Sequence, residues 1–149
     1  MVSSIDSARK GAQARAIFEQ GYNCAQSVAM AYAEDLGCDE ALLSTVASSF
    51  GGGFARCREV CGAVSGMGVI SGFVIPATDP KDRASKAANY ALVQSAIERF
   101  RQENGSIVCR ELLGLTANPN VRSPKRSCAE LVEMAAQLIG EAINSREQK

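Results

Sequence analysis

Apolar residues recur along most of this chain at intervals of three and four, the spacing of one face of an α-helix. The clearest case is the longest predicted helix, whose apolar face consists of Tyr90, Val93, Ile97 and Phe100. Runs in which apolar and polar residues alternate, the pattern of half-buried strands, are scarce. The pattern therefore predicts an all-α fold.

Capping residues give the clearest helix boundaries. Asn23, with Gln26 three residues later, forms a capping box that begins a helix, which we expect to run to Gly37. Ser127 and Glu130 form the same arrangement before the last helix. The other expected elements are a helix from about Ser4 to Gly21, a short helix after Asp39, a glycine-rich helix from about Val60 to Ile75, a long helix that Asp79 and Pro80 begin and that ends near Gly105, and one or two turns from Ser106 to Gly114. Together they predict a single domain over residues 1–149, a bundle of five or six helices with the glycine-rich helix at its centre.

Composition limits the classes of function. The 149 residues include 16 basic and 16 acidic side chains, so a nucleic-acid or anionic-membrane partner is not expected. There is no histidine, so any metal ion must be held by sulfur or oxygen ligands. The stretch Met1–Ala16 has no apolar run typical of a signal peptide, and we expect a cytoplasmic protein.

One uncharged stretch, from Val60 to Thr78, has two interpretations. It could be a membrane-spanning helix with small residues at its contact face, or a buried helix of a soluble bundle. The flanking helices are charged and amphipathic, as a soluble bundle requires, so we expect no membrane span.

Four of the six cysteines fall at or near predicted helix starts: Cys24, Cys61, Cys109 and Cys128. A helix start offers unpaired N–H groups and a partial positive charge, which favour the reactive thiolate over the thiol. Basic residues stand in the same places: Arg56, Arg58, Arg110, Lys125 and Arg126. The alternative is that these cysteines are small buried hydrophobic residues. Cys38, in a turn after Gly37, we take as a packing or surface residue.

Two further features bear on the cysteines. No Cys-x-x-Cys motif is present, which disfavours a thioredoxin-like motif and a zinc ribbon. Gly62 and Gly66 lie one helical turn apart beside Cys61, so a bound group could approach that helix face closely, and we take both as candidate cofactor-binding residues. Tight packing of helices would require the same glycines.

Several motifs of the chain resemble one protein family: Asn23-Cys24-Ala25-Gln26, Phe50-Gly51-Gly52-Gly53, Cys61-Gly62-Ala63-Val64-Ser65-Gly66, Cys109-Arg110-Glu111-Leu112-Leu113-Gly114 and Cys128. They are similar to the redox-active proteins labelled C-GCAxxG-C-C, over about residues 15 to 140. The label writes Gly-Cys-Ala where this chain has Cys-Gly-Ala. The resemblance implies that Cys24, Cys61, Cys109 and Cys128 are the family's four cysteines; Cys38 and Cys57 lie outside that pattern.

Three functions remain open. In the first, the four cysteines form a thiol–disulfide site of a possible oxidoreductase, with Cys61 as the reactive thiol and Cys24 or Cys109 resolving the product against a redox partner or a small-molecule oxidant. In the second, the same four thiolates bind an iron–sulfur cluster or zinc. In the third, the chain is a non-catalytic helical interaction protein. A two-fold homodimer is a further expectation.

Overall fold

A computed structural model describes residues 4–147, and over this range the all-α prediction is confirmed. Eight helices occur in the described part of the chain, rather than five or six, because short helices separate the longer ones. They are α1 (Ser7–Glu19), α2 (Cys24–Met30), α3 (Ala33–Leu36), α4 (Glu40–Val46), α5 (Gly62–Val74), α6 (Arg83–Asn104), α7 (Cys109–Leu112) and α8 (Cys128–Glu147).

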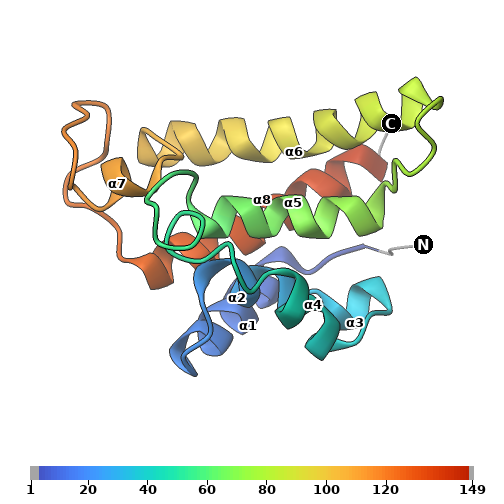
Figure 1. Ribbon diagram of the computed structural model, residues 1–149, viewed down its shortest axis with the longest axis horizontal. Helices are drawn as coiled ribbons and strands as arrows, with labels where there is room; N and C mark the ends of the chain where they lie inside the picture. Colours follow the sequence, from blue (N-terminus) through green and yellow to red (C-terminus); the bar gives the residue numbers. More distant parts are fainter. Residues whose placement is uncertain (1–3, 148–149) are drawn as a thin grey trace.

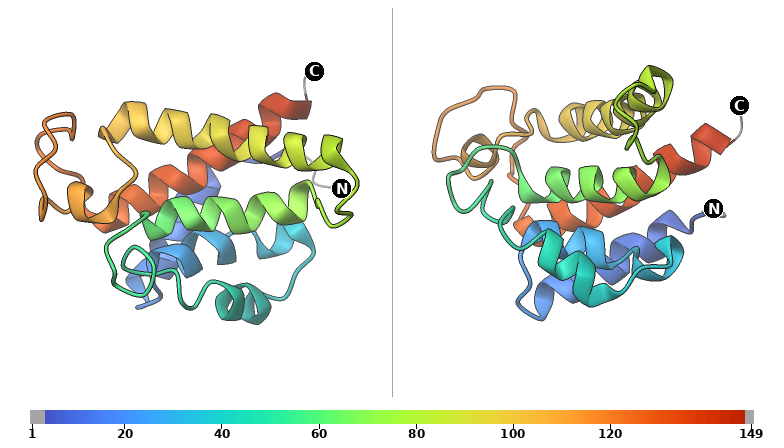
Figure 2. Two further views of the ribbon diagram at one scale, coloured as in Figure 1. Left: turned by 45° about the horizontal axis from the view of Figure 1, so that its top comes forward. Right: turned by 45° about the vertical axis from the view of Figure 1, so that its right-hand side comes forward.

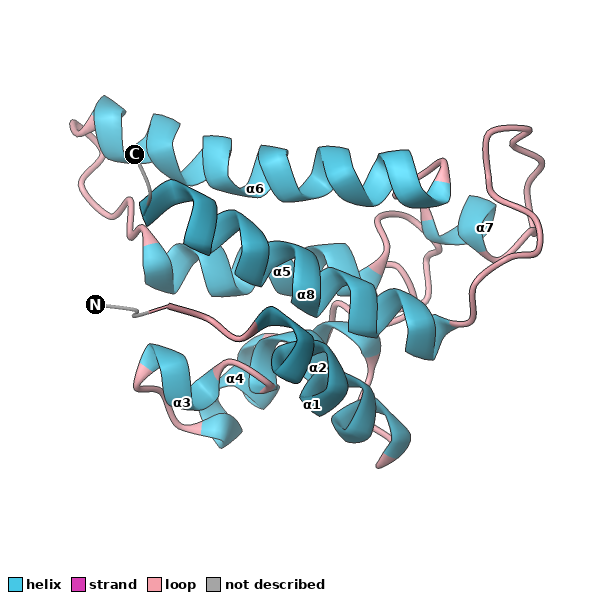
Figure 3. Ribbon diagram, turned by 180° about the vertical axis from the view of Figure 1, so that it is seen from behind, coloured by secondary structure: helices cyan, strands magenta, loops and turns pink. Residues whose placement is uncertain are grey.

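The long helices form three layers (Figures 1 and 3). The helix α6 makes one outer layer, α5 and α8 lie in the middle, and α1 and α2 lie on the other side with α3 and α4. The contacts agree with this order, since α8 touches α1, α2, α5 and α6, and α5 touches α2, α6 and α8. Fully buried side chains from several layers fill the core, among them Tyr32, Met67, Phe100 and Ile139.

The expected helix from Asn23 to Gly37 is interrupted, so that part of the prediction is wrong. The helix α2 ends at Met30, and α3 begins again at Ala33. The Ala31 carbonyl, which a continuous helix would use for its own ladder, accepts a hydrogen bond of 3.2 Å from the buried ammonium of Lys10 on α1. The ring of Tyr32 is fully buried, and its hydroxyl donates to the Ala136 carbonyl of α8 at 2.7 Å. Contacts with other helices therefore override the local helix signal.

The start of α6 also differs from the prediction. The helix begins at Arg83 and not at Pro80, because Asp82 is the residue that caps it. The Asp82 carboxylate accepts hydrogen bonds from the backbone N–H of Ser85 at 3.0 Å and from its hydroxyl at 2.6 Å. Asp79 instead accepts from the N–H of Lys81 at 2.9 Å, which is the geometry of a turn.

The uncharged stretch from Val60 to Thr78 forms no spanning helix. Its helical part, α5, ends at Val74, and α2, α6 and α8 contact it. Across residues 4–147, none of the helices has both the length and the apolar character needed to cross a membrane.

Candidate functional site

Four of the six cysteines surround one cavity of about 40 Å³. Residues at or beside the starts of α5, α7 and α8 line it, and these three helices begin at the same end of the molecule (Figures 1 and 2). Its lining residues are Cys24, Gly52, Gly53, Arg58, Cys61, Gly62, Cys109, Leu112, Leu113, Cys128 and Leu131. The volume has room for a water-sized group, so only the reacting end of a larger molecule could enter.

Helix starts position these cysteines. Cys24 is the first residue of α2, after a capping box in which the Gln26 N–H donates to the Asn23 side chain at 2.8 Å. Cys128 is the first residue of α8, after a second capping box between Ser127 and Glu130. Both capping-box predictions are confirmed. Cys109 begins the short helix α7, and Cys61 immediately precedes α5.

Backbone pairing fixes Cys61 relative to Cys109. The Cys61 N–H donates to the Ile107 carbonyl at 2.8 Å, and the Cys109 N–H donates to the Glu59 carbonyl at 2.6 Å. The two segments run antiparallel at this point. The Arg110 guanidinium also binds the Glu59 carboxylate through two hydrogen bonds of 2.9 and 3.2 Å. The approach to α5 and the approach to α7 are therefore held together as one unit.

The loop before Cys61 contains a left-handed turn. Five consecutive residues have positive φ angles between 49° and 70°: Gly52, Gly53, Phe54, Ala55 and Arg56. A left-handed conformation costs about 1–2 kcal/mol at each non-glycine residue. Hydrogen bonds within the loop offset part of that cost, including those from the N–H of Arg58 to the Gly52 carbonyl at 3.1 Å and from the N–H of Glu59 to the Gly53 carbonyl at 2.8 Å.

This turn brings Gly53 against the cavity. A Cβ atom at Gly53 would lie 2.5 Å from the Cβ of Cys109, so only glycine fits there. The turn also directs Arg58, whose own φ is 62°, toward the thiols. Its Nη1 atom lies 3.8 Å from the Cys109 sulfur, within reach of a hydrogen bond to sulfur. Arg58 stands three residues before Cys61 in the sequence, but the sulfur that it contacts is that of Cys109.

Cys24 and Cys128 both line the cavity, and each affects the ionisation of the other. The interaction raises the pKa of Cys24, and burial raises it further. The same interaction with Cys24 lowers the pKa of Cys128 to about 6, with a further contribution from the positive charge of Arg58 and against an opposing effect of burial. The two pKa values are therefore moved in opposite directions, upward for Cys24 and downward for Cys128.

The expected reactive thiol at Cys61 is not supported by its surroundings. The side chain is only 6% exposed, and burial raises its pKa to about 11. The N–H groups of Ala63 and Val64 at the start of α5 act in the opposite direction, without overcoming the effect of burial. A helix start alone is therefore not enough to ionise this thiol.

The two candidate glycines have different positions. Gly62 lines the cavity, and a Cβ atom there would lie 2.8 Å from the Phe50 carbonyl oxygen and 3.1 Å from the Cys24 Cβ. Gly66 lies away from the cavity, where its missing side chain lets α5 approach Val28 of α2. Packing of α2 against α5 therefore accounts for Gly66.

Cys38 and Cys57 are not among the residues that line the cavity. Cys38 packs against a second small core cluster, and Cys57 is exposed on the loop before α5. Across the part of the chain that the structure describes, no three cysteine, aspartate or glutamate side chains are grouped as a metal site.

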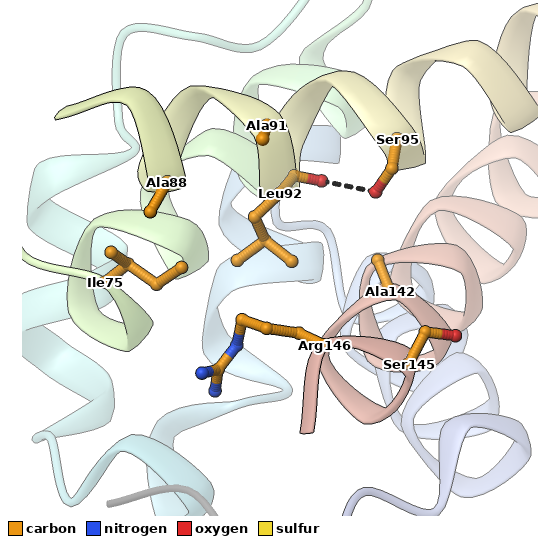
Figure 4. Close-up of a pocket in the computed structure, with 8 residues that line it drawn as sticks. All are labelled: Ile75, Ala88, Ala91, Leu92, Ser95, Ala142, Ser145 and Arg146. Carbon is orange, nitrogen blue, oxygen red and sulfur yellow. Dashed lines mark hydrogen bonds between the residues drawn. The ribbon is translucent and has the colours of Figure 1, made fainter. Parts of the chain in front are cut away.

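A larger cavity of about 320 Å³ lies elsewhere, between the end of α5, α6 and the end of α8 (Figure 4). It is lined mainly by small and apolar side chains such as Ala91, Leu92 and Ala142, and the guanidinium of Arg146 extends into it. Its lining includes no cysteine, so the thiol chemistry belongs to the smaller cavity.

Sequence reasoning missed the pairing of Cys24 with Cys128 and the direction of Arg58. The two best-capped helix starts, at Cys24 and Cys128, were a usable signal for the pair. No local signal marks the path of Arg58, since it depends on the left-handed turn.

Comparison with protein families matches residues 22–142 to the family described as "Putative redox-active protein (C_GCAxxG_C_C)". Neither the curated proteins nor the solved structures give a significant match to the chain.

Proposed function

The chain belongs to the C_GCAxxG_C_C family of redox-active proteins, and on this premise we propose that Cys24 and Cys128 are a dithiol that exchanges with disulfides. Cys128 is the attacking thiolate, and Cys24 is the resolving thiol. The observation that carries the proposal is that these two side chains, each the first residue of a capped helix, line the same cavity.

The charge state supports this division of roles. A thiolate is the nucleophile in disulfide exchange, and a thiol with a pKa near or below the ambient pH is ionised without an added base. Cys128, with a pKa of about 6, meets this condition. Cys24 stays protonated beside it, so it can release a proton when it reacts in the second step.

The proposed exchange has two steps. The Cys128 thiolate attacks one sulfur of the substrate disulfide, the substrate S–S bond breaks, and one substrate thiolate leaves. The leaving thiolate takes the Cys24 proton. The Cys24 thiolate then attacks the Cys128 sulfur of the mixed disulfide, and the second substrate thiolate leaves and takes a proton from solvent. Overall, the two protein sulfurs lose two electrons and the proton of Cys24, solvent supplies a second proton, and the substrate disulfide becomes two thiols.

The other two cysteines support the pair in this proposal. Cys109 holds Arg58 near the site through the contact of 3.8 Å, and Arg58 in turn lowers the pKa of Cys128. Cys61 is too deeply buried to meet a substrate, and it forms part of the cavity wall.

The test is the reaction of the reduced protein with an aromatic disulfide whose released thiol is coloured. We expect two coloured thiols per protein at the pair, and peptide mapping should show a Cys24–Cys128 disulfide. Cys24→Ser should stop the reaction after one thiol and leave a mixed disulfide on Cys128. Cys38→Ser should behave as the unmodified protein. A disulfide that maps to other cysteines would disprove the assignment.

A further inference from the structure

Three cationic side chains lie beside the walls of the cysteine cavity. Arg58 lines the cavity itself. Arg56 belongs to the left-handed turn, and its Cγ would lie 2.8 Å from a Cβ atom placed on the lining residue Gly52. Lys125 donates a hydrogen bond of 3.3 Å to the carbonyl of Leu113, another lining residue. Two loops far apart in the sequence therefore bring positive charge to the same place.

The nearby acidic side chains bind other partners rather than these three cations. Across residues 4–147, the three cations form no ion pair with a carboxylate. The nearby carboxylates have other donors: Arg110 binds Glu59, side-chain hydroxyl and amide groups bind Glu111, and the backbone N–H of Ser127 binds Glu130. The start of α8, a helix of 20 residues, adds partial positive charge at Cys128.

From this arrangement we propose that the preferred oxidant is a small disulfide with carboxylate groups near its sulfur atoms. This inference rests on the proposed function. The cavity of about 40 Å³ admits the sulfur end of such a molecule, so its remaining groups must stay at the entrance, among the cations. Arg56 and Lys125 bind the carboxylates there, while one sulfur meets the Cys128 thiolate. A positive entrance raises the encounter rate of an anionic substrate.

The experiment compares two disulfides of opposite charge, the anionic disulfide of glutathione and the cationic disulfide cystamine. Each second-order rate of Cys24–Cys128 oxidation is divided by the rate of the same disulfide with a free small thiol, which removes intrinsic reactivity. The ratio of the two normalised rates, anionic disulfide over cationic disulfide, should be about ten at low ionic strength. It should fall toward one at high salt.

A charge variant and a matched control locate the effect. The double substitution Arg56→Gln and Lys125→Gln should lower the ratio at least threefold. The control, Arg83→Gln with Lys86→Gln, removes the same charge from exposed positions at the start of α6, at the opposite end of the molecule from α7 (Figure 1). It should leave the ratio unchanged.

The outcomes separate this inference from the function on which it rests. If both disulfides oxidise the pair with a normalised ratio near one, insensitive to salt, the substrate class is wrong and the thiol exchange stands. If the control lowers the ratio as much as the entrance variant, net charge is responsible and the inference is overturned. If neither disulfide oxidises the pair, the proposed function fails, and the substrate class fails with it.

Discussion

Arg58 Nη1 lies 3.8 Å from Cys109 Sγ, although the two residues are 51 positions apart in the sequence. The positive charge held in this way also contributes to the low pKa of Cys128. The ionisation of one cysteine therefore depends on an arginine that another cysteine helps to hold.

Arg58→Gln should raise the pKa of Cys128, because the favourable charge is removed while burial of the thiol remains. We expect a drop of roughly fivefold in the alkylation rate of Cys128 at pH 6 with a neutral reagent, the change in thiolate fraction for a rise of about one pKa unit from about 6. Arg83→Gln, an exposed change at the start of α6, is the control and should leave this rate unchanged. Equal effects of the two variants would contradict the assignment.

Cys128 should provide the fast-reacting thiol of the reduced protein. Its alkylation rate should rise with a midpoint near pH 6 and level off above pH 7, well below the ordinary thiol pKa of about 8.5. Cys128→Ser should remove this phase, and Cys61→Ser should retain it, because burial keeps Cys61 protonated. Mass spectrometry of the modified peptides gives the alkylation rate of each cysteine and shows whether Cys128 or Cys61 reacts fast. Loss of the fast phase in Cys61→Ser would restore Cys61 as the nucleophile.

Gly53→Ala should destabilise the protein by about 2 kcal/mol or more. The substitution adds a Cβ atom 2.5 Å from the Cys109 Cβ and 2.8 Å from the Glu59 nitrogen, at a φ of 70°. The comparison is Gly68→Ala, at an exposed helical position where nothing lies within 4 Å of the new atom. That variant should be neutral or up to about 1 kcal/mol more stable. Urea unfolding of both variants measures the difference, and equal stabilities would argue against the left-handed turn.

Cys61 should make the protein less stable at alkaline pH. The unfolded thiol ionises near pH 8.5 and the folded one near pH 11, so above pH 8.5 the unfolded state binds fewer protons and stability falls as pH rises. From pH 7 to pH 9.5 this thiol alone should account for a loss of about 1.4 kcal/mol.

Unfolding of Cys61→Ser at the two pH values checks this, since the variant should lose about 1.4 kcal/mol less stability than the unmodified protein over the same range. Val64→Ala is the control, because it removes buried surface from the same turn of α5 without removing a titrating group. It should lower stability by a similar amount at both pH values. An unchanged pH dependence in Cys61→Ser would show that this thiol is not protected from ionisation.

Local signals predicted the parts of the fold that depend on neighbours in the sequence. The capping boxes at Asn23 and Ser127 are made by residues three positions apart, so the starts of α2 and α8, and with them Cys24 and Cys128, were readable from the chain. The start of α6 was misplaced because Asp79 and Asp82 are both able to cap a helix, and only the structure selects Asp82.

Other parts depend on contacts that no local pattern contains. The break after α2 follows from the ammonium of Lys10 and the buried hydroxyl of Tyr32, which bond to distant carbonyls. The protonation of Cys61 follows from burial by surrounding elements, while its position beside α5 suggested the opposite. Helix-start arguments could identify the cysteines of the cavity, and they could not rank their reactivity.

The distance along the chain between Cys24 and Cys128 has a thermodynamic consequence. These residues are 104 positions apart, so a bond between them would enclose α2 through α7 in one covalent ring. In the chain-entropy account, a crosslink that closes a loop of about 100 residues stabilises the folded state by about 4–5 kcal/mol. Through the thermodynamic cycle, the same free energy favours the disulfide in the folded chain over the disulfide in the unfolded chain. The redox potential of the pair and the melting temperature of the protein would then report the same quantity, and each oxidation event would also tighten the whole bundle.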